Sequence, residues 1–223
     1  MEMISFSEAF DIVMSSDIRI KDTETISFTA SLNRVLAGDV ISDMDMPPFN
    51  KSSVDGFACR KDDLAEELEV IETIPAGAWP SKNIKRGTCS RVMTGAPVPE
   101  GADFMIMVEE TETLTSGKIR FTGVIKKDNI SYRGEDIRKG DVVIRAGTLI
   151  RPQHTGVMAA AGHTTPLVRL KPVVAVISSG SELVEPDRVP GVSQIRNSNS
   201  SQLMAQIDKA GATGRYYGIA EDD

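Results

Sequence analysis

VVAVISSG, residues 173–180, is the stretch that decides the fold of the carboxyl-terminal part of the chain. The run from Val173 to Ile177 is continuously apolar, and it is bounded by Pro172 and by the turn Ser178-Ser179-Gly180. A short apolar run between turn residues is typical of a parallel strand that is buried on both faces. The run therefore predicts the first strand of an α/β sheet.

A helix and a second strand are expected after this run. The helix is predicted over Ser198 to Ala210, because a serine stands at its start as a cap, apolar residues follow at helical spacing, and Gly211 stops it. The second strand is predicted over Arg215 to Ala220, with Glu221 to Asp223 at its carboxyl end. Residues 169–223 are thus expected to be the start of a doubly wound parallel α/β domain.

Two parallel strands and one helix cannot cover both faces of such a sheet. We therefore expect the 223 residues to be a truncated or cleaved product of a longer protein. The intact mass of the dissolved sample tests this expectation, and a native stop codon after Asp223 would contradict it.

The rest of the chain predicts a multidomain α+β and α/β fold with an inserted β-rich domain. Short runs rich in Val, Ile, Phe and Thr alternate with Gly and Pro from about Met46 onward, and they predict strands over 68–74, 88–93, 104–108 and 118–124. We expect residues 46–138 to form this β-rich domain. It is inserted into an elongated helical and strand scaffold of residues 1–45 plus 139–168.

Within the scaffold, apolar spacing and helix stops define the expected elements. Helices are predicted over Phe6–Met14 after Ser5, over Ser31–Ala37 before Gly38, and over Arg151–Ala161 with Pro152 in its first turn. Strands are predicted over 25–29, 142–144 and 148–150.

Composition argues against several classes of function. The net charge is −7, and no run of Lys and Arg has interleaved aromatic residues, so nucleic acid is not the expected partner. No apolar run approaches membrane length, and acidic residues interrupt the first twenty residues, so we expect a cytoplasmic protein without a membrane partner. Cys59 and Cys89 have neither CxxC spacing nor a histidine at ligand spacing, and they are expected to be buried free thiols.

Three polar segments of the first 140 residues have both a structural and a functional interpretation. Asp55-Gly56 is either a hairpin turn or a functional carboxylate. The loop after Arg91 is either a plain turn or an anion site built from the Thr94 hydroxyl and backbone N–H groups. Arg133, in Arg-Gly-Glu-Asp, is either a phosphate clamp or part of a solvated charged rim.

A fourth segment, Ser178 to Leu183, follows the first predicted strand, and Asp222 follows the second. Open α/β sheets bind ligands at the carboxyl ends of their strands, so this segment favours a site. Two carboxylates that face an anionic substrate repel it unless a cation lies between them. Glu182 and Asp222 therefore imply Mg²⁺.

In chain order, six segments closely resemble the molybdopterin molybdotransferase family, whose eukaryotic relatives include the carboxyl-terminal domain of gephyrin. They are PPFNKSSVDGFA, RVMTGAPVPEGAD, NISYRGEDIRKG, AGTLIRP, VAVISSGSEL and YGIAEDD. The resemblance implies a transferase that inserts molybdenum from molybdate into adenylylated molybdopterin and releases AMP and the molybdenum cofactor, with Mg²⁺. It also implies a homodimer whose site lies between the β-rich domain of one subunit and the molybdopterin-binding α/β domain of the other.

The same resemblance suggests roles for single residues. Asp55, Glu182 and Asp222 are expected to be catalytic, with Glu182 and Asp222 also holding the metal ion. Thr94, Arg133 and Ser179 are expected to bind substrate, although Ser179 and Ser181 stand where the family has Thr and Asp. The family continues with glycine-rich, lysine and Pro-Gly segments that do not occur here, so the fragment is expected to be inactive alone.

Two other functions are compatible with parts of the sequence. The chain could be a non-catalytic dimeric scaffold or binding module of the same family, which the intact set of acidic and basic residues disfavours. It could also be a generic phosphate-binding protein with His154 and His163 as ligands. Because these histidines lie in a helix turn and just past its end, an ordinary polar or packed role is favoured for both.

Overall fold

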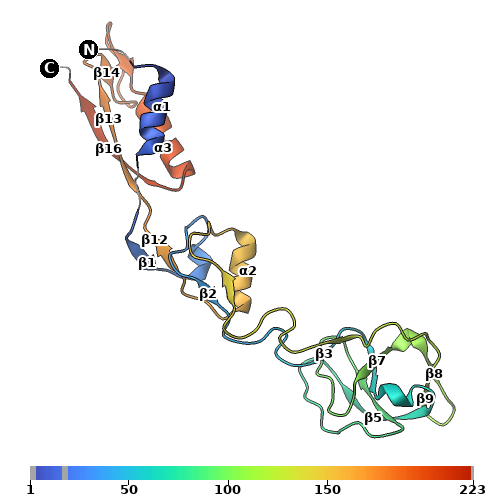
Figure 1. Ribbon diagram of the computed structural model, residues 1–223. Coiled ribbons are helices and arrows are strands. Elements are labelled where there is room, and N and C mark those ends of the chain that lie inside the picture. Colours follow the sequence, from blue (N-terminus) through green and yellow to red (C-terminus); the bar gives the residue numbers. More distant parts are fainter. Residues whose placement is uncertain (1–3, 17–19, 222–223) are drawn as a thin grey trace. The chain divides into compact units, whose positions relative to one another are not determined.

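The structure is a computed structural model that describes residues 4–16 and 20–221, and it divides into two compact units (Figure 1). Unit 1 contains the residues up to Val40 and those from Ile144 onward, and unit 2 is Ile41–Val143. The chain passes from one unit to the other at β2 (Val40–Ile41) and β11 (Val142–Ile144). The β-rich segment expected over residues 46–138 lies within unit 2.

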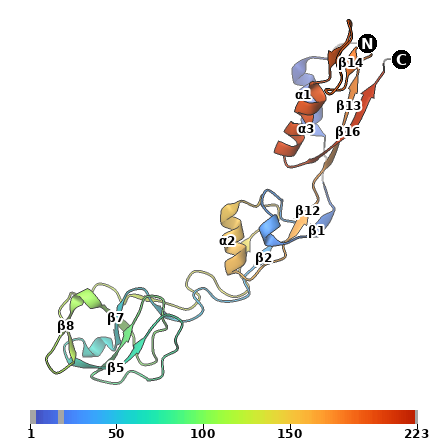
Figure 2. The ribbon, with the colours of Figure 1, turned by 180° about the vertical axis from the view of Figure 1, so that it is seen from behind.

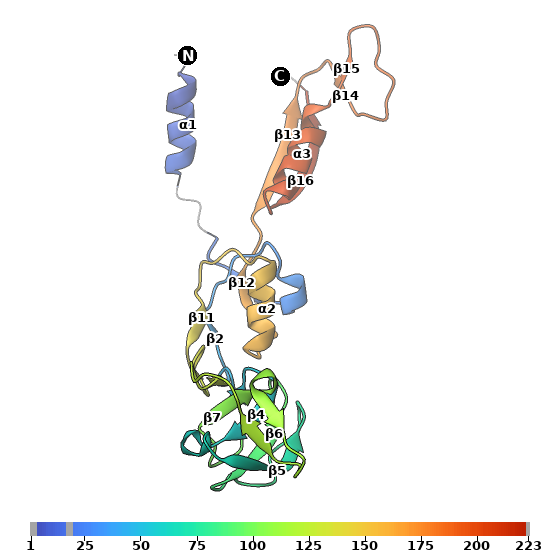
Figure 3. The ribbon, with the colours of Figure 1, turned by 90° about the vertical axis from the view of Figure 1, so that its right-hand side faces the viewer.

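Unit 2 is built on a six-stranded mixed sheet with the order β7-β4-β6-β5-β9-β8 (Figure 3). β4 is antiparallel to both of its neighbours, whereas β5 and β6 are parallel. The strands are β4 (Gly56–Cys59), β5 (Glu67–Ile74), β6 (Thr88–Val92), β7 (Phe104–Met107), β8 (Thr111–Thr113) and β9 (Ile119–Phe121). Three of the four strands predicted for this region agree within one residue at each end, and the fourth, β9, is shorter than predicted.

The core of unit 2 covers both faces of this sheet. One cluster of buried side chains includes Phe57, Leu68 and Ile106, and the other includes Ile74, Val92 and Met105. Because successive strand residues point to opposite faces, every residue of β4 is buried. The unit also contains the short antiparallel ladder of β3 (Lys51–Ser52) with β10 (Ile130–Ser131), and the 3₁₀ turns Lys61–Asp63 and Val108–Glu110.

The α/β part of unit 1 has the predicted order of strand, helix and parallel strand. β13 (Val173–Ser179) pairs in parallel with β16 (Thr213–Ala220), and α3 (Asn199–Lys209) lies along them (Figure 2). A Cβ on Gly214 of β16 would lie 2.7 Å from the Met204 sulfur, which places the apolar face of α3 directly on the sheet. A second parallel ladder pairs β14 (Leu183–Val184) with β15 (Ile195–Arg196).

Two details of this part differ from the prediction. The run 173–177 is not buried on both faces: Val176 is buried, but Val173 and Ile177 are more than half exposed, because α3 covers one face of a two-stranded sheet. Ser198 does not cap α3 with its side chain. Instead, the Asn197 side-chain oxygen accepts the Ser200 N–H at 3.2 Å.

The remainder of unit 1 contains two helices and a two-stranded ladder. α1 (Phe6–Ser15) begins as predicted at Ser5, which forms a capping box with Glu8. α2 (Pro152–Ala160) has its proline in the first turn, as predicted. β1 (Thr23–Thr25) pairs with β12 (Leu167–Arg169), and a 3₁₀ turn spans Phe28–Ala30, so the strand predicted over 25–29 is wrong beyond Thr25.

The helix predicted over Ser31–Ala37 is also wrong. The Leu36 N–H donates to the Thr148 carbonyl and the Asn33 N–H to the Ile150 carbonyl, so backbone donors pair across the unit instead of within a helix. Asn33 has a φ of 61°, which an α-helix does not accommodate. Residues 148–150, predicted as a strand, form a single bridge at Leu149. A predominantly helical scaffold is therefore not confirmed. In the described part of the chain, no helix is long and apolar enough to cross a membrane.

Candidate functional site

Asp55 and Thr94 form the most sharply defined polar contact in unit 2. One carboxylate oxygen of Asp55, Oδ1, accepts the Thr94 N–H at 2.7 Å and the Thr94 hydroxyl at 2.8 Å. Strand pairing brings them together, because Asp55 directly precedes β4, Thr94 follows β6, and Gly56 stands opposite Val92 in the antiparallel register. Both side chains are exposed.

The Thr94 backbone N–H, and after it the Thr94 hydroxyl, lower the pKa of Asp55 below its ordinary value, with a smaller contribution from the charge of Arg91. The carboxylate is therefore ionised at neutral pH. Its other oxygen, Oδ2, accepts no hydrogen bond from a described residue. Asp55 thus has one oxygen that is held in place and one that is open to a ligand.

The hairpin interpretation of Asp55-Gly56 is wrong. Gly56 is the first residue of β4, and a Cβ there would lie 1.8 Å from the Ile106 carbonyl oxygen of β7. The glycine is therefore required by the close approach of two strands. The adjacent backbone is tied to the Thr94 loop as well, since Ser52 exchanges hydrogen bonds of 2.9 Å with Gly95 and Ala96.

Arg133 is held at a second place in unit 2. Its Nε donates to Asp45 Oδ2 at 2.6 Å, and its backbone N–H donates to Asn50 Oδ1 at 2.9 Å. The Lys139 N–H, followed by Arg133, lowers the pKa of Asp45. Asp45 was not predicted, because nothing in its local sequence pattern indicates a pairing with a residue so far along the chain.

Asp55 and Arg133 are not joined by any hydrogen bond or ion pair among the described residues. The ladder of β3 and β10 explains their separation: it is antiparallel, with Ser52 opposite Ile130. The chain therefore leaves the ladder at one end toward Asp55 and at the other end toward Arg133. Unit 2 thus presents two distinct polar positions.

The predicted loop after β13 lines a pocket of about 410 Å³ in unit 1 that includes Ser178, Ser179 and Asn197. The Ser178 hydroxyl donates to Asn197 Oδ1 at 3.2 Å, and Asn197 Nδ2 donates to the Tyr216 hydroxyl at 2.9 Å. Tyr216 in turn donates to Glu185 at 2.9 Å. These hydrogen bonds link Ser178 at the start of the loop to Asn197, Tyr216 and Glu185. The last three residues were not predicted, because they come from three separate segments of the chain.

Glu182 projects from the same loop. Gly180 has a φ of 140°, and a Cβ on it would lie 2.6 Å from a Glu182 carboxylate oxygen, so the glycine leaves room for the acid. The Glu182 side chain is exposed and makes no hydrogen bond or ion pair to a described residue. Ser179 pairs with Ala220, which places the start of this loop beside the end of β16. Asp222 lies outside the described residues.

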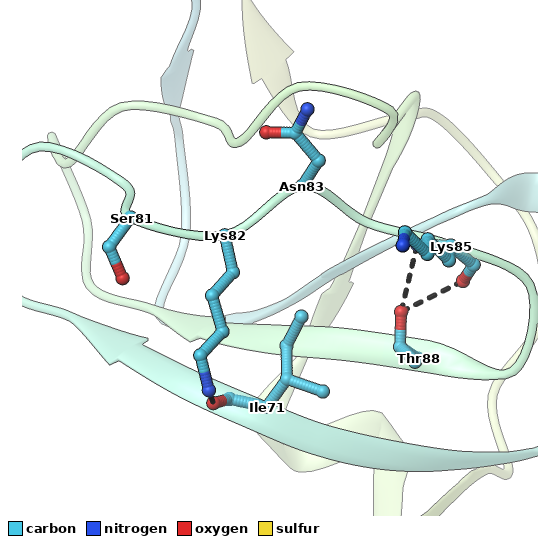
Figure 4. Close-up of a pocket in the computed structure, with 6 residues that line it drawn as sticks. All are labelled: Ile71, Ser81, Lys82, Asn83, Lys85 and Thr88. Atoms are coloured by element: carbon cyan, nitrogen blue, oxygen red, sulfur yellow. Dashed lines mark hydrogen bonds between the residues drawn. The ribbon is translucent and has the colours of Figure 1, made fainter.

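Another pocket of unit 2, of about 560 Å³, is lined by several side chains that are already hydrogen-bonded (Figure 4). Lys82 Nζ donates to the Ile71 carbonyl at 2.7 Å, and the Ser81 hydroxyl donates to Glu72 at 2.7 Å. The Thr88 hydroxyl accepts a hydrogen bond from the Lys85 backbone N–H and donates one to the Lys85 carbonyl. The side chains of Ser81, Lys82 and Thr88 are therefore already hydrogen-bonded within unit 2.

Local contacts test the interpretations of His154 and of the two cysteines, whereas that of His163 stays a prediction. His154 Nδ1 accepts the Arg151 N–H at 3.1 Å at the start of α2, which is a structural role. Cys59 and Cys89 are free and buried, as predicted, and burial raises the pKa of both thiols, that of Cys89 to about 12. Within the described residues, no group of three or more His, Cys, Asp or Glu side chains is arranged to hold a metal ion.

The family model of the MoeA N-terminal region (domain I and II) matches residues 4–162. The chain belongs to the MoeA family. The resemblance to molybdopterin molybdotransferases is thereby confirmed. The MoeA match includes Asp55, Thr94 and Arg133, whereas Ser179 and Glu182 lie beyond it.

Two curated relatives are named molybdopterin molybdenumtransferase. The protein from Bacillus subtilis (strain 168) is 38% identical over 213 residues, which cover 91% of this chain and 50% of that protein. The protein from Staphylococcus epidermidis (strain ATCC 12228 / FDA PCI 1200) is 37% identical over 228 residues, 99% of this chain and 54% of that protein. The chain thus spans about half the length of the curated MoeA relatives that it matches.

Solved MoeA structures have the same fold. The molybdopterin biosynthesis moeA protein from Pyrococcus horikoshii OT3 matches with a TM-score of 0.88 and 33% identity, covering 100% of this chain and 61% of that chain. A second structure of a Pyrococcus MoeA protein matches with a TM-score of 0.84 and 31% identity, covering 58% of that chain.

Proposed function

We propose that the full-length protein is a molybdopterin molybdotransferase that inserts molybdenum from molybdate into adenylylated molybdopterin, releasing AMP and the molybdenum cofactor. The observation that carries the proposal is the Asp55–Thr94 contact, in which two motifs far apart in sequence form one polar site. The names of the relatives at 37 to 38% identity support the same activity. Their shared name supports a role in molybdenum cofactor biosynthesis.

Asp55 is the proposed catalytic carboxylate of unit 2. It is ionised, one oxygen is anchored, and the other is free to orient a reacting group or to accept a proton from it. Thr94 directs its single hydroxyl proton to Asp55, so it positions this carboxylate, while its oxygen and the following loop remain available to substrate. Arg133 keeps two unused nitrogen atoms for anionic oxygen, and Ser179 lines the unit 1 pocket for the same purpose.

Glu182 and Asp222 are the proposed ligands of Mg²⁺. The donor set fits the ion, because Mg²⁺ prefers carboxylate oxygen and Glu182 is an exposed carboxylate without a described partner. The ion, when bound, would neutralise phosphate oxygens of the adenylylated substrate. Glu182 and Asp222 would hold the ion by their carboxylate oxygens.

The assembly is also part of the proposal. We propose a homodimer in which the β-rich domain of one subunit and the α/β domain of the other share the site, in the cytoplasm and without nucleic acid or membrane partners. The 223-residue chain by itself is proposed to be inactive, which its span of about half the length of its relatives supports.

Reconstitution tests the proposal. Full-length protein is mixed with adenylylated molybdopterin, molybdate and Mg²⁺, and an apo-molybdoenzyme reports cofactor formation while AMP release is measured. We expect both signals from the full-length protein and neither from the 223-residue chain. A folded dimer that yields neither signal would instead support the non-catalytic scaffold, and turnover by the chain alone would contradict the proposed need for further segments.

A further inference from the structure

A pocket of about 420 Å³ in unit 2 combines aromatic walls with unused polar groups. We call it the Trp79 pocket; it is lined by Phe49, Asn50, Trp79, Asn83, Glu100 and Arg133, together with three prolines and a valine. Phe49 and Trp79 meet edge to face, with ring centroids 5.7 Å apart and planes at 84°. This geometry holds the indole in place by an ordinary aromatic contact.

Trp79 is unusual in its exposure. It is the single tryptophan of the chain, and 73% of its surface is accessible. Because Phe49 meets it edge to face, most of the indole surface remains open to a further planar group. Stacking of a heteroaromatic ring on an exposed aromatic side chain is a general means of binding nucleobases.

Unused donors lie on the Arg133 side of the pocket. Arg133 Nε is occupied by Asp45, but neither Nη atom donates to a described residue. Asn50 Oδ1 accepts the Arg133 N–H, which leaves the Asn50 amide N–H groups without a described acceptor. Guanidinium and amide N–H groups in one pocket favour an anionic oxygen.

An acceptor is contributed by Glu100. One of its oxygens, Oε2, accepts from Asn83 Nδ2 at 3.1 Å, and the other accepts nothing from a described residue. A carboxylate oxygen at the pocket wall suits a ring that carries amino or N–H donors. The neighbouring pocket at Lys82 and Lys85 lacks this combination, because neither an aromatic side chain nor a carboxylate is among its lining residues.

We propose that the Trp79 pocket binds a planar heteroaromatic ring that carries an anionic group, with the ring stacked on Trp79 and the anionic oxygen bound by Arg133. The inference rests on the proposed function in one respect: adenylylated molybdopterin contains two such groups, an adenine nucleotide and a pterin. Both present amino and ring nitrogen groups to Glu100. The adenine nucleotide and the pterin thus share the chemistry that the pocket would recognise, and the experiment below distinguishes between them.

Binding is measured on the 223-residue chain with two probes, AMP and pterin-6-carboxylate. Trp79 fluorescence reports AMP binding directly, because no other tryptophan contributes. Calorimetry measures both probes, since pterins absorb in the range of tryptophan emission. We expect saturable binding of at least one probe, and the probe that binds more tightly identifies the source of the ring.

Two variants and one control test the contacts. Trp79→Ala and Arg133→Met should each weaken binding about tenfold, as expected for loss of a stacked ring or of a charged donor. Lys85→Met also removes one positive charge, but from the neighbouring pocket, and should leave the affinity unchanged. Both Trp79 and Arg133 are exposed, so circular dichroism should show all variants folded.

The inference is overturned if neither probe binds saturably, or if Trp79→Ala binds as tightly as the unaltered chain. Equal weakening by Lys85→Met would also overturn it, because general charge attraction would then explain the binding. These outcomes are separate from the proposed function. If the full-length protein inserts molybdenum but the 223-residue chain binds neither probe, the proposed Trp79 pocket is rejected and the proposed function is retained.

Discussion

Thr94 donates two hydrogen bonds to the same carboxylate oxygen of Asp55, one from its backbone and one from its hydroxyl, at 2.7 and 2.8 Å. The antiparallel pairing of β4 with β6 sets this contact, since Gly56 stands opposite Val92. The pair therefore forms through the strand register of unit 2 alone. Asp55 is held as an anion at the amino end of β4, an interior strand of the sheet.

Replacement of Thr94 by Val should raise the pKa of Asp55. The hydroxyl donor is lost and the backbone donor remains, so the pKa should move toward, without reaching, that of a free aspartate. NMR titration of the carboxyl carbon measures this shift. Thr113→Val, at an exposed edge-strand threonine, is the control and should leave the titration of Asp55 unaltered.

The same pair makes a pH-dependent contribution to stability. The folded-state pKa of Asp55 is lowered, so the contribution is present above the unfolded pKa and is lost as the pH falls through the folded one. The loss on acidification should be smaller in Thr94→Val. An unchanged Asp55 titration in that variant would show that the hydroxyl bond does not matter.

Gly56→Ala should destabilise the protein strongly. The new Cβ would lie 1.8 Å from the Ile106 carbonyl oxygen, so β4 and β7 must separate, and we expect a loss of about 3 kcal/mol or more in the free energy of unfolding. Gly156→Ala is the matched control, because nothing lies within 4 Å of its Cβ and it is inside α2. That change should stabilise by about 0.5–1 kcal/mol. Urea denaturation measures both, and similar effects from the two would contradict the close approach.

Sequence pattern predicted those parts of the fold that local residues determine. α1 and α3 have apolar spacing with a cap or a glycine stop, and β13 is a bounded apolar run, so all three were located within two residues. The segment Ser31–Ala37 has helical spacing as well, but its backbone pairs with residues around Thr148 and Ile150. Tertiary hydrogen bonding overrides local propensity there, and a single sequence carries no signal for it.

The candidate site shows the same division. Asp55, Thr94 and Arg133 lie in short polar motifs beside Gly or Pro, which is why they could be singled out. Asp45, which fixes Arg133, lies 88 residues away from it and was not found. Partners of this kind depend on strand pairing, so residue chemistry alone does not identify them.

Tyr216→Phe should lower the free energy of unfolding. It removes the acceptor of the buried Asn197 amide and the hydroxyl that donates to the partly exposed Glu185. Tyr217→Phe is the matched control: its hydroxyl is more exposed and makes one long contact of 3.5 Å, so its effect should stay below about 0.5 kcal/mol. Chemical denaturation followed by circular dichroism compares them, and equal effects would refute the buried bond chain.

The pKa of Tyr216 provides an independent check. Burial, followed by the bond to Glu185, raises this pKa above its ordinary value. Its stabilisation is therefore present below the unfolded pKa and is lost as the pH rises through the folded one. The bond to Asp128 also raises the pKa of Tyr132, so ultraviolet titration should show late ionisation of both Tyr132 and Tyr216. In Tyr216→Phe the contribution of Tyr216 should vanish and that of Tyr132 should remain.

The thiols of Cys59 and Cys89 should be unreactive in the folded chain. Both are completely buried, and burial raises the pKa of each, so little reactive thiolate forms at neutral pH. A thiol-reactive chromogenic reagent should label neither residue under native conditions and both in denaturant. Rapid native labelling of either one would contradict the core packing of unit 2.

The rate of molybdenum insertion by Asp55→Ala in the full-length protein tests the central claim most directly. With adenylylated molybdopterin, molybdate and Mg²⁺, we expect AMP release and cofactor formation to fall about 100-fold or more, as for loss of a positioned catalytic acid or base. Asp62→Ala, which removes an exposed surface carboxylate, should retain full activity. An Asp55→Ala protein that inserts molybdenum at the unaltered rate would contradict the account.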